Sequence, residues 1–232
     1  MLNLSHSDNQ IQCVSSYEEL FDSAFKGNTN ALCWERNLIG DFSEIIYKVN
    51  ATENISTLSV GDLNSLDLSI LGKIARDTIV TDFQLLESFG ASPVINIIKH
   101  YEKDDALPFF PTDVYSFHVD RSPIPTNTFL CTYFGESSEI IANSKAEQKI
   151  LIPEFRVELK KLHQGNDNEF EAFLSEYFFD LHYKPKPGEG VTKLGNGNLW
   201  KLAVDHPKSK VLPCIHRAPI EKKGESRLLL IC

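Results

Sequence analysis

The sequence predicts an α+β protein in which an N-terminal helical layer is followed by a β-rich core that carries one mostly helical insert. Apolar residues recur at helical spacing over much of residues 15–90, whereas after about residue 107 short runs of Val, Thr, Phe and Tyr alternate with turns. The 232 residues suit a single domain. We expect its N-terminal helical part at 1–105 and its core at 106–232, with the helical insert at 153–190.

The N-terminal part contains three segments with helical periodicity, which cover residues 15–26, 41–50 and 65–90. Ser16 can cap the first, because Glu19 follows three residues later in the pattern of a capping box. The third ends in Gly90, as many helices do. Residues 92–102, "SPVINIIKHYE", fit either a β-branched strand or a short helix.

The core is expected to consist of short strands at residues 114–120, 126–134, 138–144, 199–204, 211–220 and 225–232. Two helices are expected within the insert, at 153–164 and 168–183. The second is aromatic and amphipathic, so it either packs on the core or covers a pocket as a lid.

Composition restricts the possible partners and compartments. The net charge is −9 and the basic residues are scattered, which argues against binding to nucleic acid or to an anionic membrane. The five cysteines include no Cys-x-x-Cys pair, and three lie in apolar runs, so we expect reduced thiols and a cytoplasmic protein. The N-terminus lacks the pattern of a signal peptide. A small molecule or a peptide is the expected substrate.

The segment "FHVD" contains the residues most indicative of function. Side chains two residues apart on a strand point to the same face, so His118 and Asp120 could bind one metal ion together. His216, in "CIHRAP", is the best third ligand. Two His and one carboxylate form the facial triad of non-haem Fe(II) enzymes. The alternative is a hydrogen-bonded polar pair without a metal.

Arg227 follows His216 by 11 residues. If the connection is a hairpin with an even loop, Arg227 faces Ala218 across the strand pair and stands roughly 7 Å from His216, the length of two strand steps. An arginine there could pair with the far carboxylate of a diacid that chelates the metal. Alternatively, Arg227 is a surface residue paired with Glu225 or Glu221.

Two further residues have both a functional and a structural interpretation. Tyr133 could donate its hydroxyl to a bound carboxylate, or it could be a core aromatic residue. Cys214 lies two residues before His216, so a Cys-x-His pair could bind zinc, although a small buried cysteine is the usual case. No G-x-S-x-G motif of a serine hydrolase is present.

The motif "HVD" at 118–120, with His216 and then Arg227, resembles that of the 2-oxoglutarate- and Fe(II)-dependent oxygenases. The segments "FHVD", "FLCTYFG", "IHRAP", "ESRLLLI" and "ALCWERN" together also resemble an uncharacterised bacterial family of unknown function. The resemblance extends over most of the chain, but the informative motifs span only about 40 residues in all.

The oxygenase resemblance implies a double-stranded β-helix, a cupin-like jelly roll of two packed sheets. It implies Fe(II) at His118, Asp120 and His216, and 2-oxoglutarate bound through Arg227, for a dioxygenase that hydroxylates its substrate. Many members of that family have Ser two residues after the Arg, where this chain has Leu229, and the helical insert lengthens the spacing between the two His. The alternative is a non-catalytic or zinc-dependent cupin-like metal-binding protein that acts as a sensor or interaction module.

Overall fold

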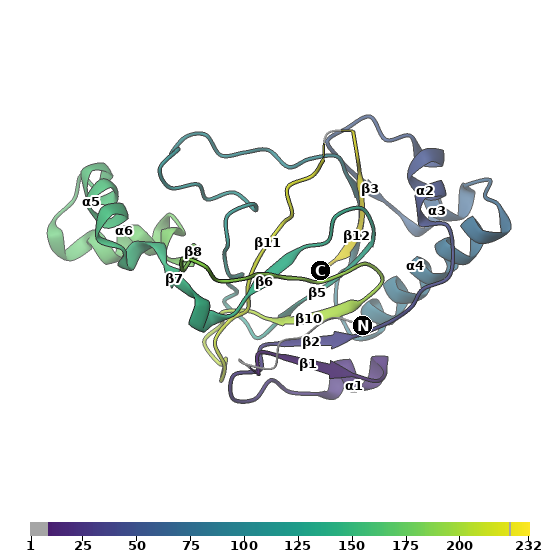
Figure 1. The fold of residues 1–232 in the computed structure, drawn as a ribbon, viewed down its shortest axis with the longest axis horizontal. Coiled ribbons are helices and arrows are strands. Elements are labelled where there is room, and N and C mark those ends of the chain that lie inside the picture. Colours follow the sequence, from purple (N-terminus) through teal and green to yellow (C-terminus); the bar gives the residue numbers. More distant parts are fainter. Residues whose placement is uncertain (1–8, 223) are drawn as a thin grey trace.

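The computed structural model describes residues 9–222 and 224–232, and it has a mixed α+β fold (Figure 1). A large, mostly antiparallel sheet contains seven strands in the order β1-β2-β10-β5-β12-β4-β3. Their bounds are β1 Ile11–Val14, β2 Ala31–Trp34, β3 Ile55–Leu58, β4 Val94–Ile98, β5 Asn127–Phe134, β10 Leu199–Ala203 and β12 Arg227–Ile231. The apolar segment 92–102 is therefore a strand at β4.

Four helices of the N-terminal part pack on one face of this sheet. They are α1 Tyr17–Asp22, α2 Phe42–Val49, α3 Val60–Ser65 and α4 Ile70–Ser88. Each begins after a polar N-cap, and Ser16, Asp41 and Ser69 accept backbone N–H bonds at the starts of α1, α2 and α4. Among the described residues, none of the helices combines the length and the apolar character needed to cross a membrane.

The alternation of side chains along β5 separates two hydrophobic clusters. Phe129, Cys131 and Tyr133 pack with the helices, whereas Leu130 packs in a second cluster with Ile140 and other residues on the opposite face. We call the region around this second cluster the interior between the sheets. It is formed where the large sheet faces a smaller one.

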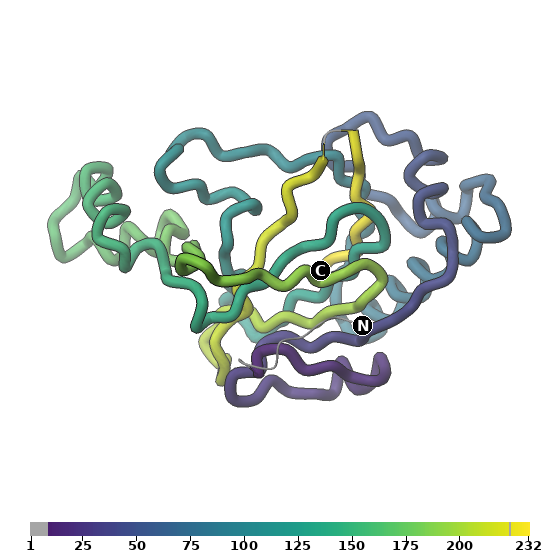
Figure 2. Tube along the Cα trace, viewed as in Figure 1, coloured from purple at the N-terminus to yellow at the C-terminus, as the bar shows by residue number. Residues whose placement is uncertain are grey.

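The smaller sheet contains three strands in the order β11-β6-β9, namely β6 Glu139–Ile141, β9 Thr192–Lys193 and β11 Ile215–Arg217. A separate pair joins β7 Ala146–Gln148 to β8 Tyr183–Pro185. Between β7 and β8 the chain forms α5 Pro153–Leu162 and α6 Phe170–Glu176, which lie at the end of the molecule away from α2–α4 (Figure 2). The insert packs around its own small cluster, which includes Phe110 and Leu174.

Three expectations about individual elements need correction. The N-terminal part is not only helical, because β1–β4 complete the large sheet. The strand expected at 114–120 is reduced to isolated bridges at His118, and residues 114–116 form a turn because the Asp113 carboxylate accepts the N–H groups of Tyr115 and Ser116. The helix expected at 168–183 ends at Glu176. It is followed by Phe178 with a left-handed backbone (φ 60°) and by a 3₁₀ turn at Phe179–Leu181.

A buried ion pair ties α4 to the large sheet. Arg36 donates to both carboxylate oxygens of Asp82 at 2.7 and 2.8 Å, and the Tyr133 hydroxyl donates to the same carboxylate at 2.6 Å. Both members of the pair are almost fully buried. Removing one partner of such a pair leaves an uncompensated charge in the core.

We therefore expect Asp82→Ala to lower the free energy of unfolding by about 3–5 kcal/mol, measured by urea denaturation. Asp77→Ala is the matched control, because Asp77 pairs with Arg76 on the same helix but its side chain is 65% exposed. The control should cost less than about 1 kcal/mol. Equal effects of the two substitutions would show that the buried pair does not anchor α4.

Candidate metal centre

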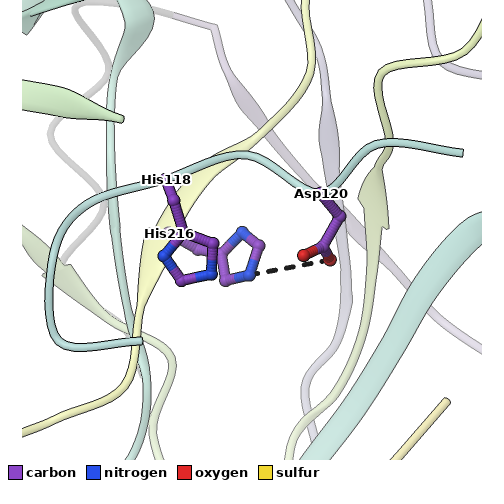
Figure 3. A group of neighbouring side chains, drawn as sticks. All are labelled: His118, Asp120 and His216. Carbon is purple, nitrogen blue, oxygen red and sulfur yellow. Dashed lines mark ion pairs between the residues drawn. The ribbon is translucent and has the colours of Figure 1, made fainter. Parts of the chain in front are cut away.

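The metal centre predicted from the sequence is assembled by backbone pairing between two distant segments. His118 and His216 exchange hydrogen bonds, each N–H donating to the other's carbonyl at 2.9 Å. Residues paired in this way project their side chains to the same face. Asp120 follows two residues after His118, and one ligand atom of each residue lies within 4.8 Å of the others (Figure 3). His216 Nε2 is 3.7 Å from Asp120 Oδ2.

Neighbouring backbone carbonyls determine which ring nitrogen of each His is available. His118 Nδ1 lies 2.7 Å from the Ser116 carbonyl, and His216 Nδ1 lies 3.1 Å from the Cys214 carbonyl. A carbonyl only accepts, so both Nδ1 atoms carry hydrogen, and a neutral imidazole held in this way keeps its lone pair on Nε2. Such second contacts orient the imidazole ligands of metal sites and set their tautomer.

The charge states also suit metal binding. Burial, together with His216, lowers the pKa of His118 to about 4, so its imidazole is neutral near pH 7. Burial raises the pKa of the Asp120 carboxyl, but His216, the Thr128 hydroxyl and His118 together hold it below its usual value. Neutral imidazole and ionised carboxylate are the forms that bind a metal ion.

A second group of polar residues beside the triad was missed in the sequence. His182 pairs with His118 on the side away from His216, and the rings of His182 and His118 are 5.9 Å apart between centroids. Lys149 Nζ donates to the Ser116 hydroxyl at 2.7 Å, and that hydroxyl lies 3.2 Å from His182 Nδ1. Because Lys149 can only donate, the Ser116 hydroxyl is free to give its own hydrogen to His182.

Burial lowers the pKa values of both basic groups in this second set, that of His182 to about 3 with help from His118 and Lys149, and that of Lys149 to about 8. No local pattern pointed to these residues. His182 fell at the end of an expected helix, and Lys149 lies in a 3₁₀ turn that follows β7.

Arg227 lies on the interior face of β12, but the route that was expected to bring it there is wrong. β11 and β12 belong to different sheets, so they are not the two strands of a hairpin. The face is nevertheless the expected one, because Leu229, two residues on, packs in the interior cluster. The Arg227 residue is 2% exposed, so it is not a surface residue.

Its contact with Ser138 relates Arg227 to the triad. Arg227 Nη2 donates to the Ser138 hydroxyl at 3.1 Å. Ser138 precedes Ile140 by two residues, and Ile140 pairs with His216. Ser138 therefore lies roughly two strand steps, about 7 Å, from Ile140 along the small sheet, and Arg227 reaches this sheet beside the strand that pairs with the His216 segment. Arg227 Nε and Nη1 are buried and have no hydrogen-bond partner.

Tyr133 and Cys214 do not join this group. The Tyr133 side chain lies on the helix-covered face of the large sheet and donates to Asp82, so the expectation that it binds a co-substrate is corrected by the strand's alternation. Thr132 takes the interior position instead, and its buried hydroxyl has no partner. Cys214 packs in the interior cluster, 3.9 Å from Gln10 Nε2, and is not part of the metal-binding group. Burial raises the pKa of its thiol.

Comparison of this chain with protein-family models, with curated proteins and with solved structures yields no match. The site's interpretation therefore depends on its own geometry.

We expect His216→Ala to weaken the binding of a divalent metal by at least about a hundredfold, because changes in the outer contacts of a metal site alone cost 10–100-fold. Isothermal titration of the metal-free protein with Fe(II) under anaerobic conditions, or with Zn(II), measures the effect. His182→Ala is the matched control and should retain binding within about tenfold. A similar loss in both variants would contradict the assignment of His216 as a ligand. Loss in Cys214→Ser would favour a zinc site.

The metal-free protein should lose stability as the pH falls from about 6.5 to about 4. In this range an unfolded His takes up a proton, whereas His118 and His182, with pKa values of about 4 and about 3, do not. Each such group lowers the free energy of unfolding by up to about 1.4 kcal/mol per pH unit. Urea denaturation in the presence of a chelator gives the free energy of unfolding at each pH. This free energy should fall less steeply with falling pH in His182→Gln than in the wild type. Equal pH dependence in the two proteins would show that the pKa of His182 is not lowered by folding.

Proposed function

We propose that this protein is an Fe(II)- and 2-oxoglutarate-dependent oxygenase whose core is a double-stranded β-helix. The strand order supports the fold. From β4 onward the chain passes repeatedly between the sheets, with β4, β5, β10 and β12 in the large sheet and the His118 segment, β6, β9 and β11 on the small one. The exception is the step from β6 to β9, which both lie in the small sheet and are separated by the β7–β8 pair. Two facing sheets linked in this way are compatible with a jelly roll.

The observation that carries the proposal is the combination of the triad with a buried arginine in the same interior. Two imidazoles and one carboxylate match the ligand set of non-haem Fe(II) enzymes. Three such ligands would also suit catalytic zinc, so the triad alone does not choose the metal. Arg227 favours the oxygenase, because a buried guanidinium with two nitrogens that make no hydrogen bond is suited to a carboxylate.

Each part of the site would have a distinct role. His118, Asp120 and His216 would hold the iron on one side, and Arg227 would bind the far carboxylate of 2-oxoglutarate. When bound, iron would supply the redox chemistry by which one O2 oxidises both 2-oxoglutarate, which loses CO2 and becomes succinate, and a substrate C–H bond, with one oxygen atom going to each. The apolar interior around Trp200 and Leu229 would exclude water from this chemistry.

Leu229 stands where many of these oxygenases have a Ser, but other hydroxyl groups in the interior could bind the co-substrate. Leu229 packs in the interior cluster, but Ser138 presents a hydroxyl from the facing sheet, next to Arg227. Thr132 presents another buried hydroxyl from β5. Either could donate to the carboxylate that Arg227 binds.

The alternative is a cupin-like metal-binding protein without oxygenase turnover. One observation favours it, since Glu221 already places a carboxylate 3.7 Å from Arg227 Nη1. Under this alternative the Arg227–Glu221 pair is structural and the metal acts in sensing or in an interaction. Peptides and small molecules remain equal candidates as substrates under the first proposal.

Anaerobic titration of the Fe(II)-loaded protein with 2-oxoglutarate tests the proposal. We expect a weak visible metal-to-ligand absorption band to appear in the wild type. Arg227→Ala should retain iron but lose most of the co-substrate affinity, because a charged hydrogen-bonded pair is removed. Arg217→Ala is the control, since Arg217 on β11 pairs with Glu139 instead. Iron binding without a band in the wild type would favour the alternative.

A further inference from the structure

The environment of Arg227 contains an unusual internal carboxylate. Glu221 lies between β11 and β12, and its side chain is 5% exposed. Glu221 Oε1 is 3.7 Å from Arg227 Nη1, which is too long for a hydrogen bond, and neither atom makes a hydrogen bond elsewhere. Buried polar atoms are usually paired, so this contact leaves bonding capacity unused on both sides.

The other contacts of Glu221 form a cradle suited to a carboxylate. The Tyr115 hydroxyl donates to Glu221 Oε2 at 2.7 Å and itself accepts the N–H of Tyr101 at 2.9 Å. Arg227 is held from the far side by Ser138. A donor hydroxyl and a guanidinium thus converge on one carboxylate group. We call Arg227, Tyr115 and Ser138 together the arginine pocket.

A solvent-open cleft of about 530 Å³ borders the arginine pocket. Tyr101, Tyr115, Ile220 and Glu221 are among the residues that line it. Glu221 therefore contacts both the cleft and Arg227, and a ligand entering from the cleft would meet the Glu221 side chain first.

Among the described residues of the segment that carries Glu221, Lys222 makes exposed ion pairs on the outer side. Lys222 Nζ pairs with Glu136 at 2.9 Å, and the lysine side chain is 65% exposed. Surface ion pairs of this kind contribute little to stability. Movement of Glu221 into the cleft would break its bond with the Tyr115 hydroxyl and its poorly satisfied contact with Arg227, and an entering carboxylate can replace both.

We propose that Glu221 is a built-in competitor for the arginine pocket, which has to swing into the cleft before a dicarboxylate can bind Arg227. The entering carboxylate then takes over the Tyr115 hydroxyl and the unpartnered nitrogens of Arg227. This inference depends on the proposed function for the identity of the ligand. It adds Tyr115 as a binding residue and Glu221 as the residue that controls access.

Competition by Glu221 would also make the binding of a carboxylate ligand at Arg227 depend on the metal. A carboxylate that meets only Arg227 competes with Glu221 at a disadvantage, because Glu221 is tethered beside it. A dicarboxylate that also chelates the metal gains a second attachment and displaces Glu221. The arrangement favours chelating diacids over simple carboxylates and delays their binding until the metal is present.

Isothermal titration of the Mn(II)-loaded protein with 2-oxoglutarate tests this inference, with Mn(II) as a redox-silent substitute for iron. Glu221→Gln should tighten binding by about tenfold or more. If Glu221 occupies the pocket about nine-tenths of the time, only about one-tenth of the protein can bind the ligand, and the apparent affinity is about tenfold weaker. Glu221→Ala provides a second variant that empties the position. Tyr115→Phe, placed in the Glu221→Gln background, should weaken binding again.

Glu225→Gln is the matched control, since it removes the same charge from the same segment. Glu225 is exposed and its contact is with Lys222, so its substitution should leave the affinity unchanged. Stoichiometric Mn(II) binding confirms that each variant is folded. Equal affinities in the wild type and both Glu221 variants would show that Glu221 does not compete for the arginine pocket, while leaving the proposed function intact. No 2-oxoglutarate binding in any variant would overturn the inference together with its proposed co-substrate.

Discussion

The candidate site depends on the two backbone hydrogen bonds that His118 and His216 exchange. They join the segment before β5 to β11, and because paired residues share a face, they direct both imidazoles to one point. Asp120 reaches the same point because it follows His118 by two residues. A slip of this pairing by one residue would turn one of the His side chains to the other face of the sheet. The Ser116 and Cys214 carbonyls then orient the two rings from within their own segments.

The interior between the sheets is otherwise apolar, so its polar groups require an explanation. Leu130, Trp200 and Leu229 pack there, yet Arg227 and Thr132 have buried polar atoms without partners in the same space. Such groups cost free energy unless a ligand or water satisfies them. Their proximity to a triad with a strongly lowered His118 pKa fits the general clustering of perturbed groups at functional sites.

The parts predictable from sequence were those with a local signal. The capping residue Ser16 located the start of α1, and the His-x-Asp spacing with a later His located the triad, whereas the helix expected from residue 65 begins at Ile70. The remainder depends on contacts between distant segments. No periodicity reveals that β11 and β12 lie in different sheets, or that Tyr133 and not Thr132 faces the helices. His182 was missed because its role comes from pairing with His118, and the Asp113 turn replaced a strand that composition favoured.

X-ray absorption spectroscopy at the iron edge of the Fe(II)-loaded protein tests the central claim most directly, because it reports the atoms bound to the metal. The account predicts a first shell of nitrogen and oxygen, with the outer scattering of two imidazole rings and none from sulfur. Loss of one imidazole in His216→Ala would identify that ring. A sulfur ligand, or a shell without imidazole, would contradict the assignment of His118, Asp120 and His216 as the metal centre.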